Sequence, residues 1–133
     1  MPYGPANARI ASQPFAGRRI LIVEDEYFLA DDLAGEFRRL GADVIGPISD
    51  VDEAQELLRS RPSPDAALLD INIRNEMVFP LARELRKRNI PFVFTTGYDK
   101  DSVRPEFADV PLWEKPIDVS SLIDELVELI SRR

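Results

Sequence analysis

Neither cysteine nor histidine occurs among the 133 residues of the chain. Without cysteine the chain can form neither a disulfide framework nor a thiolate that binds a metal or acts as a nucleophile. Without histidine it lacks a serine–histidine triad, a histidine-ligated zinc site and a phosphohistidine of its own. Any phosphohistidine that takes part in its chemistry must therefore belong to a partner protein.

The chain also has no excess of positive charge and no long hydrophobic run. Its net charge of −7 argues against direct binding to nucleic acid, because contacts to the phosphate backbone need a basic surface. No stretch approaches the roughly 18 apolar residues of a membrane-spanning helix. We therefore expect no direct nucleic-acid partner, no membrane contact and a cytoplasmic location.

The length of 133 residues fits one domain with a real hydrophobic core. Residues 1–17 are rich in proline and glycine and show little periodicity, so we expect a flexible leader there. The alternative is a docking tail that uses Tyr3 or Phe15. The folded domain is expected to span residues 18–133.

Short apolar segments alternate with helical patterns along this domain. The expected strands are 19–23, 43–47, 66–70, 92–95 and 112–114, and the expected helices are 27–40, 50–61, 77–89 and 119 onward. Between Gly97 and Val110 the helical pattern is poor, so the fourth helix should be short or irregular. Right-handed crossovers then predict an α/β fold: a doubly wound (βα)5 unit with a five-stranded parallel sheet and helices on both faces.

Acidic residues follow two of these strands. Glu24 and Asp25 come directly after the first strand, and Asp70 ends the third. The carboxyl ends of parallel strands meet at one crevice, where a cluster of carboxylates either raises a pKa or requires a cation. Alone, Glu24 or Asp25 could simply cap the following helix. Together, the three acids predict a site for Mg²⁺, which prefers oxygen ligands.

Two further strands end on residues that can bind phosphate. Thr96 offers a hydroxyl group, and Gly97 leaves room for the backbone to approach a ligand. Lys115 offers an ammonium group, and the bond to Pro116 is a candidate for the cis isomer. Each residue alone is typical of ordinary turns or solvated surface. At successive strand ends they predict a site for a phosphoryl group, with Asp70 as a possible nucleophile.

With these residues the chain resembles the receiver domain of bacterial two-component response regulators, a flavodoxin-like fold. The resemblance spans about residues 18–131 and implies that Asp70 is the phosphoacceptor. It implies a Mg²⁺ site made by Glu24, Asp25, Asp70 and the backbone carbonyl of Asn72. The phosphoryl donor would be a histidine kinase or a histidine phosphotransfer protein.

The same resemblance implies that Thr96 and Lys115 contact the phosphoryl group, with Pro116 in the cis form. The segment 91–98 looks like that of an atypical receiver subgroup marked by a Phe-Ala-Thr-Gly-Tyr-like motif, with Thr95 in place of the alanine. Leu112 replaces the aromatic switch residue of the family, and the usual proline and glycine are missing from residues 71–76. We hypothesise that Tyr98 replaces that switch aromatic, although it could simply pack over the loop.

The expected function is that of a stand-alone receiver in two-component signalling. Phosphorylation of Asp70 would switch a protein-interaction surface, and it could also drive dimerisation. The chain would catalyse its own phosphorylation and dephosphorylation without being an enzyme in the usual sense. It could equally be a piece of a larger regulator.

Two other functions stay open. One is a phosphorylation-independent interaction module that keeps the same fold. The other is an aspartyl-phosphate phosphohydrolase resembling the haloacid dehalogenase group, although Asn72 stands where that group has its general acid. Trp113, the single tryptophan, lies two residues before Lys115 and should report on the site by its fluorescence.

Overall fold

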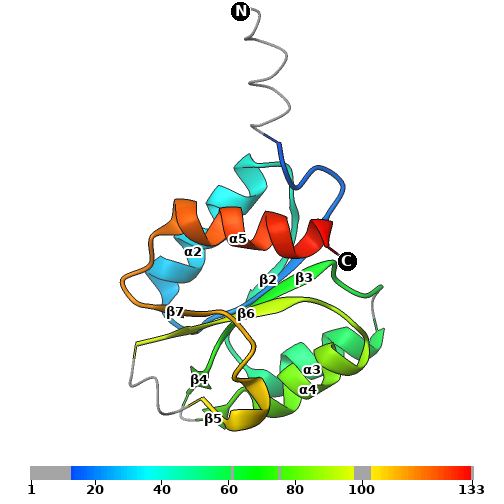
Figure 1. Cartoon of the computed structure of the whole chain (residues 1–133), viewed down its shortest axis with the longest axis vertical. Coiled ribbons are helices and arrows are strands. Elements are labelled where there is room, and N and C mark those ends of the chain that lie inside the picture. The colour runs from blue at the N-terminus through cyan, green and yellow to red at the C-terminus, as the bar shows by residue number, and fades with distance from the viewer. Residues whose placement is uncertain (1–12, 61, 75, 98–102, 133) are drawn as a thin grey trace, which may run out of the picture.

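Five parallel strands form one sheet at the centre of the molecule (Figure 1). The computed structural model describes residues 13–60, 62–74, 76–97 and 103–132. The sheet has the order β2-β1-β3-β6-β7. Its strands are β1 (Arg19–Val23), β2 (Asp43–Ile48), β3 (Ala66–Asp70), β6 (Phe92–Thr96) and β7 (Leu112–Glu114). The predicted five-stranded, doubly wound parallel sheet is confirmed.

Four α-helices cover the two faces of this sheet, and their bounds are α2 (Tyr27–Arg39), α3 (Val51–Ser60), α4 (Phe79–Lys87) and α5 (Val119–Ser131). Helices α3 and α4 lie on one face, and α2 and α5 lie on the other (Figure 1). Among the described residues between β6 and β7, the only helical element is the 3₁₀ turn η2 (Pro105–Phe107). This agrees with the short or irregular fourth helix that the sequence predicts.

Both faces of the central strands are apolar because alternate side chains of a strand point to opposite sides. In β1, Leu21 and Val23 pack toward α3 and α4, whereas Ile20 and Ile22 pack toward α2 and α5. All four side chains are buried. The rigid base this creates fixes the polar residues that follow β1 and β3.

The ring of Phe15 lies inside the core, although the sequence predicted a leader over residues 1–17. The side chain is fully buried, and its ring centroid is 5.1 Å from that of Phe37 in α2. Its backbone N–H donates a hydrogen bond to the carbonyl of Leu40. The packed domain therefore includes Phe15, whose ring is not exposed for docking. Tyr3 and the rest of residues 1–12 lie outside the described residues.

A small antiparallel pair of strands, which the sequence did not predict, begins two residues after Asp70. It consists of β4 (Asn72–Ile73) and β5 (Glu76–Met77). Ile73 is buried in the core on the α3–α4 side, so the pair is anchored to the domain. This hairpin occupies the segment in which the family's usual proline and glycine are missing.

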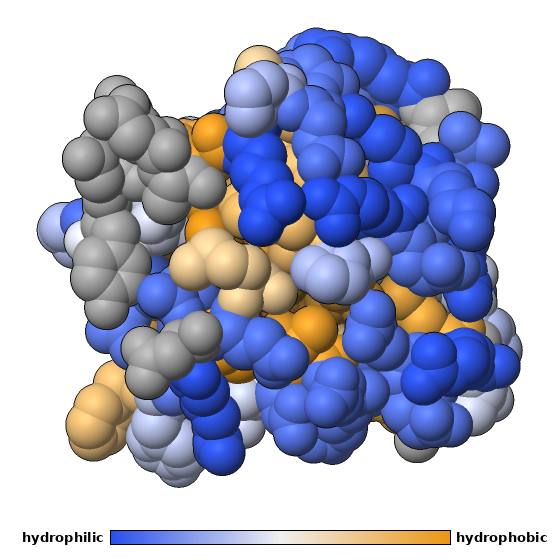
Figure 2. Space-filling model, turned by 90° about the horizontal axis from the view of Figure 1, so that it is seen from below, coloured by the Kyte–Doolittle hydropathy of each residue, from blue (hydrophilic) through white to orange (hydrophobic). Residues whose placement is uncertain are grey.

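The outer surface on the α3–α4 side is largely polar. Figure 2 views the molecule from the α3–α4 side, where hydrophilic side chains cover most of the surface and apolar atoms show mainly between them. Among the described residues, the large apolar side chains that are strongly exposed are Tyr27 and Phe28, at the start of α2. None of the described helices has the length and apolar character needed to cross a membrane.

Candidate functional site

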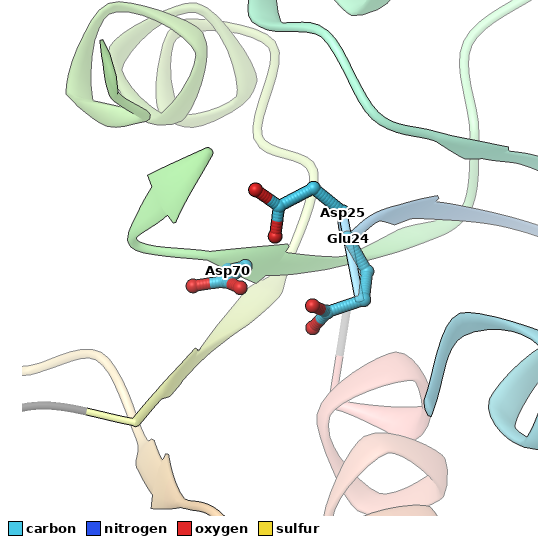
Figure 3. A group of neighbouring side chains, drawn as sticks. All are labelled: Glu24, Asp25 and Asp70. Atoms are coloured by element: carbon cyan, nitrogen blue, oxygen red, sulfur yellow. The ribbon is translucent and has the colours of Figure 1, made fainter. Parts of the chain in front are cut away.

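The carboxyl groups of Glu24, Asp25 and Asp70 gather at one end of the sheet (Figure 3). One carboxylate oxygen from each lies within 4.8 Å of those from the other two. The register explains this proximity: Val23 of β1 pairs with Leu69 of β3, so the acids follow on adjacent strands. Glu24 and Asp70 are buried, whereas Asp25 is exposed.

The ammonium group of Lys115 lies against these acids. Its Nζ is 2.9 Å from Asp70 Oδ2, 3.1 Å from Glu24 Oε2 and 2.6 Å from Glu26 Oε2. The backbone N–H of Lys115 donates to the carbonyl of Thr96, which fixes the residue at the end of β7. The Lys115–Pro116 peptide is cis, and so is the Gly46–Pro47 peptide. Lys115 thus neutralises part of a strongly acidic site.

Burial changes the acidity of this cluster. Burial and the nearby charge of Asp70 raise the pKa of Glu24 to about 7. For Lys115, burial alone would lower the pKa, but hydrogen bonds to Glu26 and Asp70 raise it above its ordinary value. The lysine therefore stays charged at neutral pH, while Glu24 is poised between its two protonation states.

The donor set fits a divalent cation. The carboxylate oxygen Glu24 Oε1 is buried and has no hydrogen-bond partner among the described residues. Three neighbouring carboxylates supply the hard oxygen ligands that Mg²⁺ prefers. The backbone N–H of Asn72 donates to Asp70 Oδ1 at 3.2 Å, so Asn72 lies beside the acceptor. That its carbonyl binds the cation remains a prediction.

A pocket of about 950 Å³ opens over the site. Asp70, Asn72, Gly97, Lys115 and Pro116 are among the residues that line it. A Cβ atom added to Gly97 would lie 3.7 Å from Lys115 Cδ, an ordinary contact distance, so this position does not strictly require glycine. The pocket gives Asp70 access to a group that arrives from outside.

Two residues that were expected to contact the phosphoryl group or to read it out, Thr96 and Leu112, do not line this pocket. Thr96 is buried at the end of β6 and does not line the pocket. Leu112 is partly buried against the core on the α3–α4 side. Tyr98, the hypothesised switch residue, lies outside the described residues. The roles suggested for these three side chains remain predictions.

Sequence reasoning missed three polar residues at or beside the site. Glu26 contacts Lys115, and its place in the acidic run after β1 was a signal that could have found it. Arg74 lines the pocket from the turn between β4 and β5, and no sequence pattern indicated that turn. Thr95 is fully buried on β6, where it pairs with Asp70 of β3, and a polar residue within an apolar strand was its signal.

No family model matches the chain, but known proteins and solved structures with similar sequences were found. The transcriptional regulatory protein PdtaR of Mycobacterium tuberculosis is 29% identical over 133 residues, which cover 97% of this chain and 63% of that protein. The chain therefore spans less than two thirds of the length of that curated relative.

Two solved structures are also similar. SdrG from Pseudomonas melonis Fr1, solved in a BeF3-activated conformation, is 36% identical with a TM-score of 0.69. The match covers 86% of this chain and 98% of SdrG. A response regulator receiver protein from Sinorhizobium medicae WSM419 is 25% identical with a TM-score of 0.75 and covers 86% and 94% of the two chains.

Proposed function

The chain belongs to the family of response regulator receiver domains, and on this premise we propose that Asp70 accepts a phosphoryl group from a partner's phosphohistidine. The observation that carries the proposal is the contact between Lys115 Nζ and Asp70 Oδ2 at 2.9 Å, inside an acidic pocket. The contact places a buried carboxylate, the proposed nucleophile, beside an ammonium group that can also bind the oxygens of the incoming phosphoryl group. The partner would be a histidine kinase or a histidine phosphotransfer protein.

In the transfer step an oxygen of the Asp70 carboxylate attacks phosphorus. The bond between phosphorus and the donor's imidazole nitrogen breaks, and the electron pair of that bond stays on the nitrogen, which can then take a proton. The product is an acyl phosphate on Asp70. Most of the acceleration in such a transfer comes from positioning and from stabilisation of charge.

The carboxylates of Glu24, Asp25 and Asp70, with the Asn72 carbonyl, would hold Mg²⁺. Bound there, the ion would neutralise negative charge on the phosphoryl oxygens. Lys115 would move its ammonium group from the carboxylates to a phosphoryl oxygen. Thr96 would turn its hydroxyl toward the same group from the end of β6.

The signal would be read as a change in a protein-interaction surface. A shift of Lys115 and Thr96 acts on the two strands that carry them, β6 and β7, because the Lys115 N–H bonds to the Thr96 carbonyl. Phosphorylation would then favour one of two arrangements of the surface around these strands. A downstream protein, or a second copy of the chain, would bind that arrangement.

Incubation with Mg²⁺ and acetyl phosphate tests the proposal directly. Intact-mass spectrometry should detect one added phosphoryl group, and Asp70→Asn should abolish it. Asp43→Asn is the matched control, since Asp43 is exposed at the opposite end of the sheet and starts β2. It should be modified like the wild type.

The same experiment separates the rival functions. A chain that takes up no phosphoryl group from acetyl phosphate, or from any phosphohistidine donor, is a phosphorylation-independent module, and the proposal fails. Sustained catalytic turnover of acetyl phosphate would favour a phosphohydrolase. An adduct that persists in Asp70→Asn would contradict the assignment of the acceptor.

A further inference from the structure

Arg74 lies in the turn between β4 and β5 and lines the same pocket as Asp70. Its backbone N–H donates to Asp25 Oδ2 at 2.9 Å, and its Nη2 donates to the Ser49 hydroxyl at 3.2 Å. The residue thus reaches the acidic cluster with its backbone and a neighbouring loop with its side chain. Nothing in the proposed transfer so far uses the guanidinium group.

The backbone contact alone does not call for an arginine. Arg74 has a φ of 51°, in the left-handed region that glycine adopts freely. A non-glycine residue costs about 1 kcal/mol there, so glycine would present the same N–H to Asp25 with less strain. The side chain at this position therefore needs its own explanation.

The charges that line the pocket explain why position 74 carries an arginine side chain. The lining carries four carboxylates (Asp25, Glu26, Asp32 and Asp70) and two cations, Lys115 and Arg74. Lys115 already contacts three carboxylates, those of Glu24, Glu26 and Asp70. Arg74 forms no ion pair within the described part of the chain, where its guanidinium meets only a neutral hydroxyl. It is the cation that is left available for an incoming anion.

We propose that the guanidinium of Arg74 binds the non-bridging oxygens of the phosphoryl group that approaches Asp70. This rests on the proposed function and adds a residue to it. The guanidinium leaves Ser49 and donates hydrogen bonds to the dianionic group, for which its planar fork is well shaped. Arg74 thereby recruits the phosphoryl group, while Lys115 is still held by carboxylates.

Three variants separate this role from a structural one. Arg74→Gly keeps the N–H that Asp25 accepts, relieves the backbone and removes only the side chain. Arg74→Lys keeps the positive charge but loses the planar guanidinium group, which can donate two parallel hydrogen bonds. Ser49→Ala is the matched control, since it breaks the same 3.2 Å contact and leaves the guanidinium in place.

The measurement is the initial rate of Asp70 phosphorylation against acetyl phosphate concentration at fixed Mg²⁺. We expect Arg74→Gly to lower the rate at subsaturating donor about tenfold or more, the effect of losing one charge-assisted hydrogen bond. The rate of Arg74→Lys should lie between those of the wild type and Arg74→Gly, and Ser49→Ala should keep the wild-type rate. Thermal unfolding and Mg²⁺ affinity, read from Trp113 fluorescence, should stay close to wild type in Arg74→Gly.

Each contrary outcome has a distinct meaning. A wild-type rate in Arg74→Gly overturns the phosphoryl role of the arginine while the proposed function stands. Equal losses in Arg74→Gly and Ser49→Ala show that the contact between the two residues is a structural clasp, which also overturns the inference. If the wild-type chain takes up no phosphoryl group, the proposed function fails and the role of Arg74 fails with it.

Discussion

Glu26 Oε2 lies 2.6 Å from Lys115 Nζ, the shortest of the three contacts between this lysine and the surrounding carboxylates. The side chain of Glu26 is 59% exposed, whereas those of Glu24 and Asp70 are buried. An exposed carboxylate thus competes with the proposed acceptor for the cation that would contact the phosphoryl group in the proposed transfer. We interpret Glu26 as a restraint on Lys115.

Replacing Glu26 with glutamine should speed the phosphorylation of Asp70. The substitution removes one charge that holds Lys115 and lets the ammonium group reach a phosphoryl oxygen. Because Glu26 is exposed and its charge is screened by solvent, we expect a gain of only about two- to fivefold in the initial rate with acetyl phosphate.

The control for this prediction is Glu53→Gln, which changes the net charge equally at an exposed site in the first turn of α3. If both variants gain equally, weaker repulsion of the anionic donor explains the effect. An Asp70 phosphorylation rate in Glu26→Gln at or below that of the wild type contradicts the interpretation.

The stability of the metal-free protein should depend on pH through Glu24. Folding raises the pKa of Glu24 from 4.5 to about 7, so the folded state holds its proton more tightly than the unfolded state. The stability that this proton contributes is fully present below about pH 4 and is lost as pH rises through about 7. We expect a loss of about 1–3 kcal/mol in the free energy of unfolding.

Urea unfolding with a chelator present, repeated from pH 5 to pH 8, measures this loss. Glu24→Gln removes the titrating group, so its stability should fall less over the same range. Parallel profiles for the two proteins would show that Glu24 does not titrate there.

The fluorescence of Trp113 should report on the site. Its indole N–H donates to Glu125 on α5 at 3.0 Å, and the residue lies two positions before Lys115. Binding of Mg²⁺ or of beryllofluoride should change the contacts of Lys115 and hence the surroundings of the indole ring. Emission should shift on titration in the wild type and stay flat in Asp25→Asn. A flat wild-type titration, with binding shown by calorimetry, would refute this.

Burial of Phe15 leads to a prediction about the N-terminal boundary. Phe15→Ala should lower the free energy of unfolding by about 3 kcal/mol, because it leaves a cavity beside Phe37. Chemical denaturation measures this loss. Gln13→Ala, at an exposed neighbouring position, should change stability little and serves as the control. A small loss in Phe15→Ala would restore the view that the segment lies outside the domain.

Periodicity predicted the fold well because each strand and helix carries its own apolar pattern. The gathering of Glu24, Asp25, Asp70 and Lys115 at one end of the sheet was expected because the carboxyl ends of parallel strands lie together. Phe15 was missed because a single aromatic residue in a segment rich in proline and glycine has no period. Its burial depends on the distant partner Phe37, which only the folded chain provides.

The hairpin after Asp70 was hidden for a related reason. Its strands have two residues each, which is too short for an alternating pattern to be recognised. Arg74 in the turn has a positive φ, a conformation that an arginine in the sequence does not indicate. Glu26 was overlooked because the two acids before it accounted for the predicted cation site. In each case the information lies in tertiary contacts rather than in local pattern.

The buried hydroxyl of Thr95 should lower the stability of the fold. The side chain of Thr95 is fully buried, and its Oγ1 has no hydrogen-bond partner in the part of the chain that the structure describes. An unpaired buried hydroxyl destabilises the folded state, so the isosteric change Thr95→Val should raise the free energy of unfolding by about 1 kcal/mol. Thr95→Ala, which removes the hydroxyl but opens a cavity, should gain less or lose stability. Urea unfolding of the three proteins measures the order. A loss of stability in Thr95→Val would mean that the hydroxyl has a partner, such as a buried water, in solution.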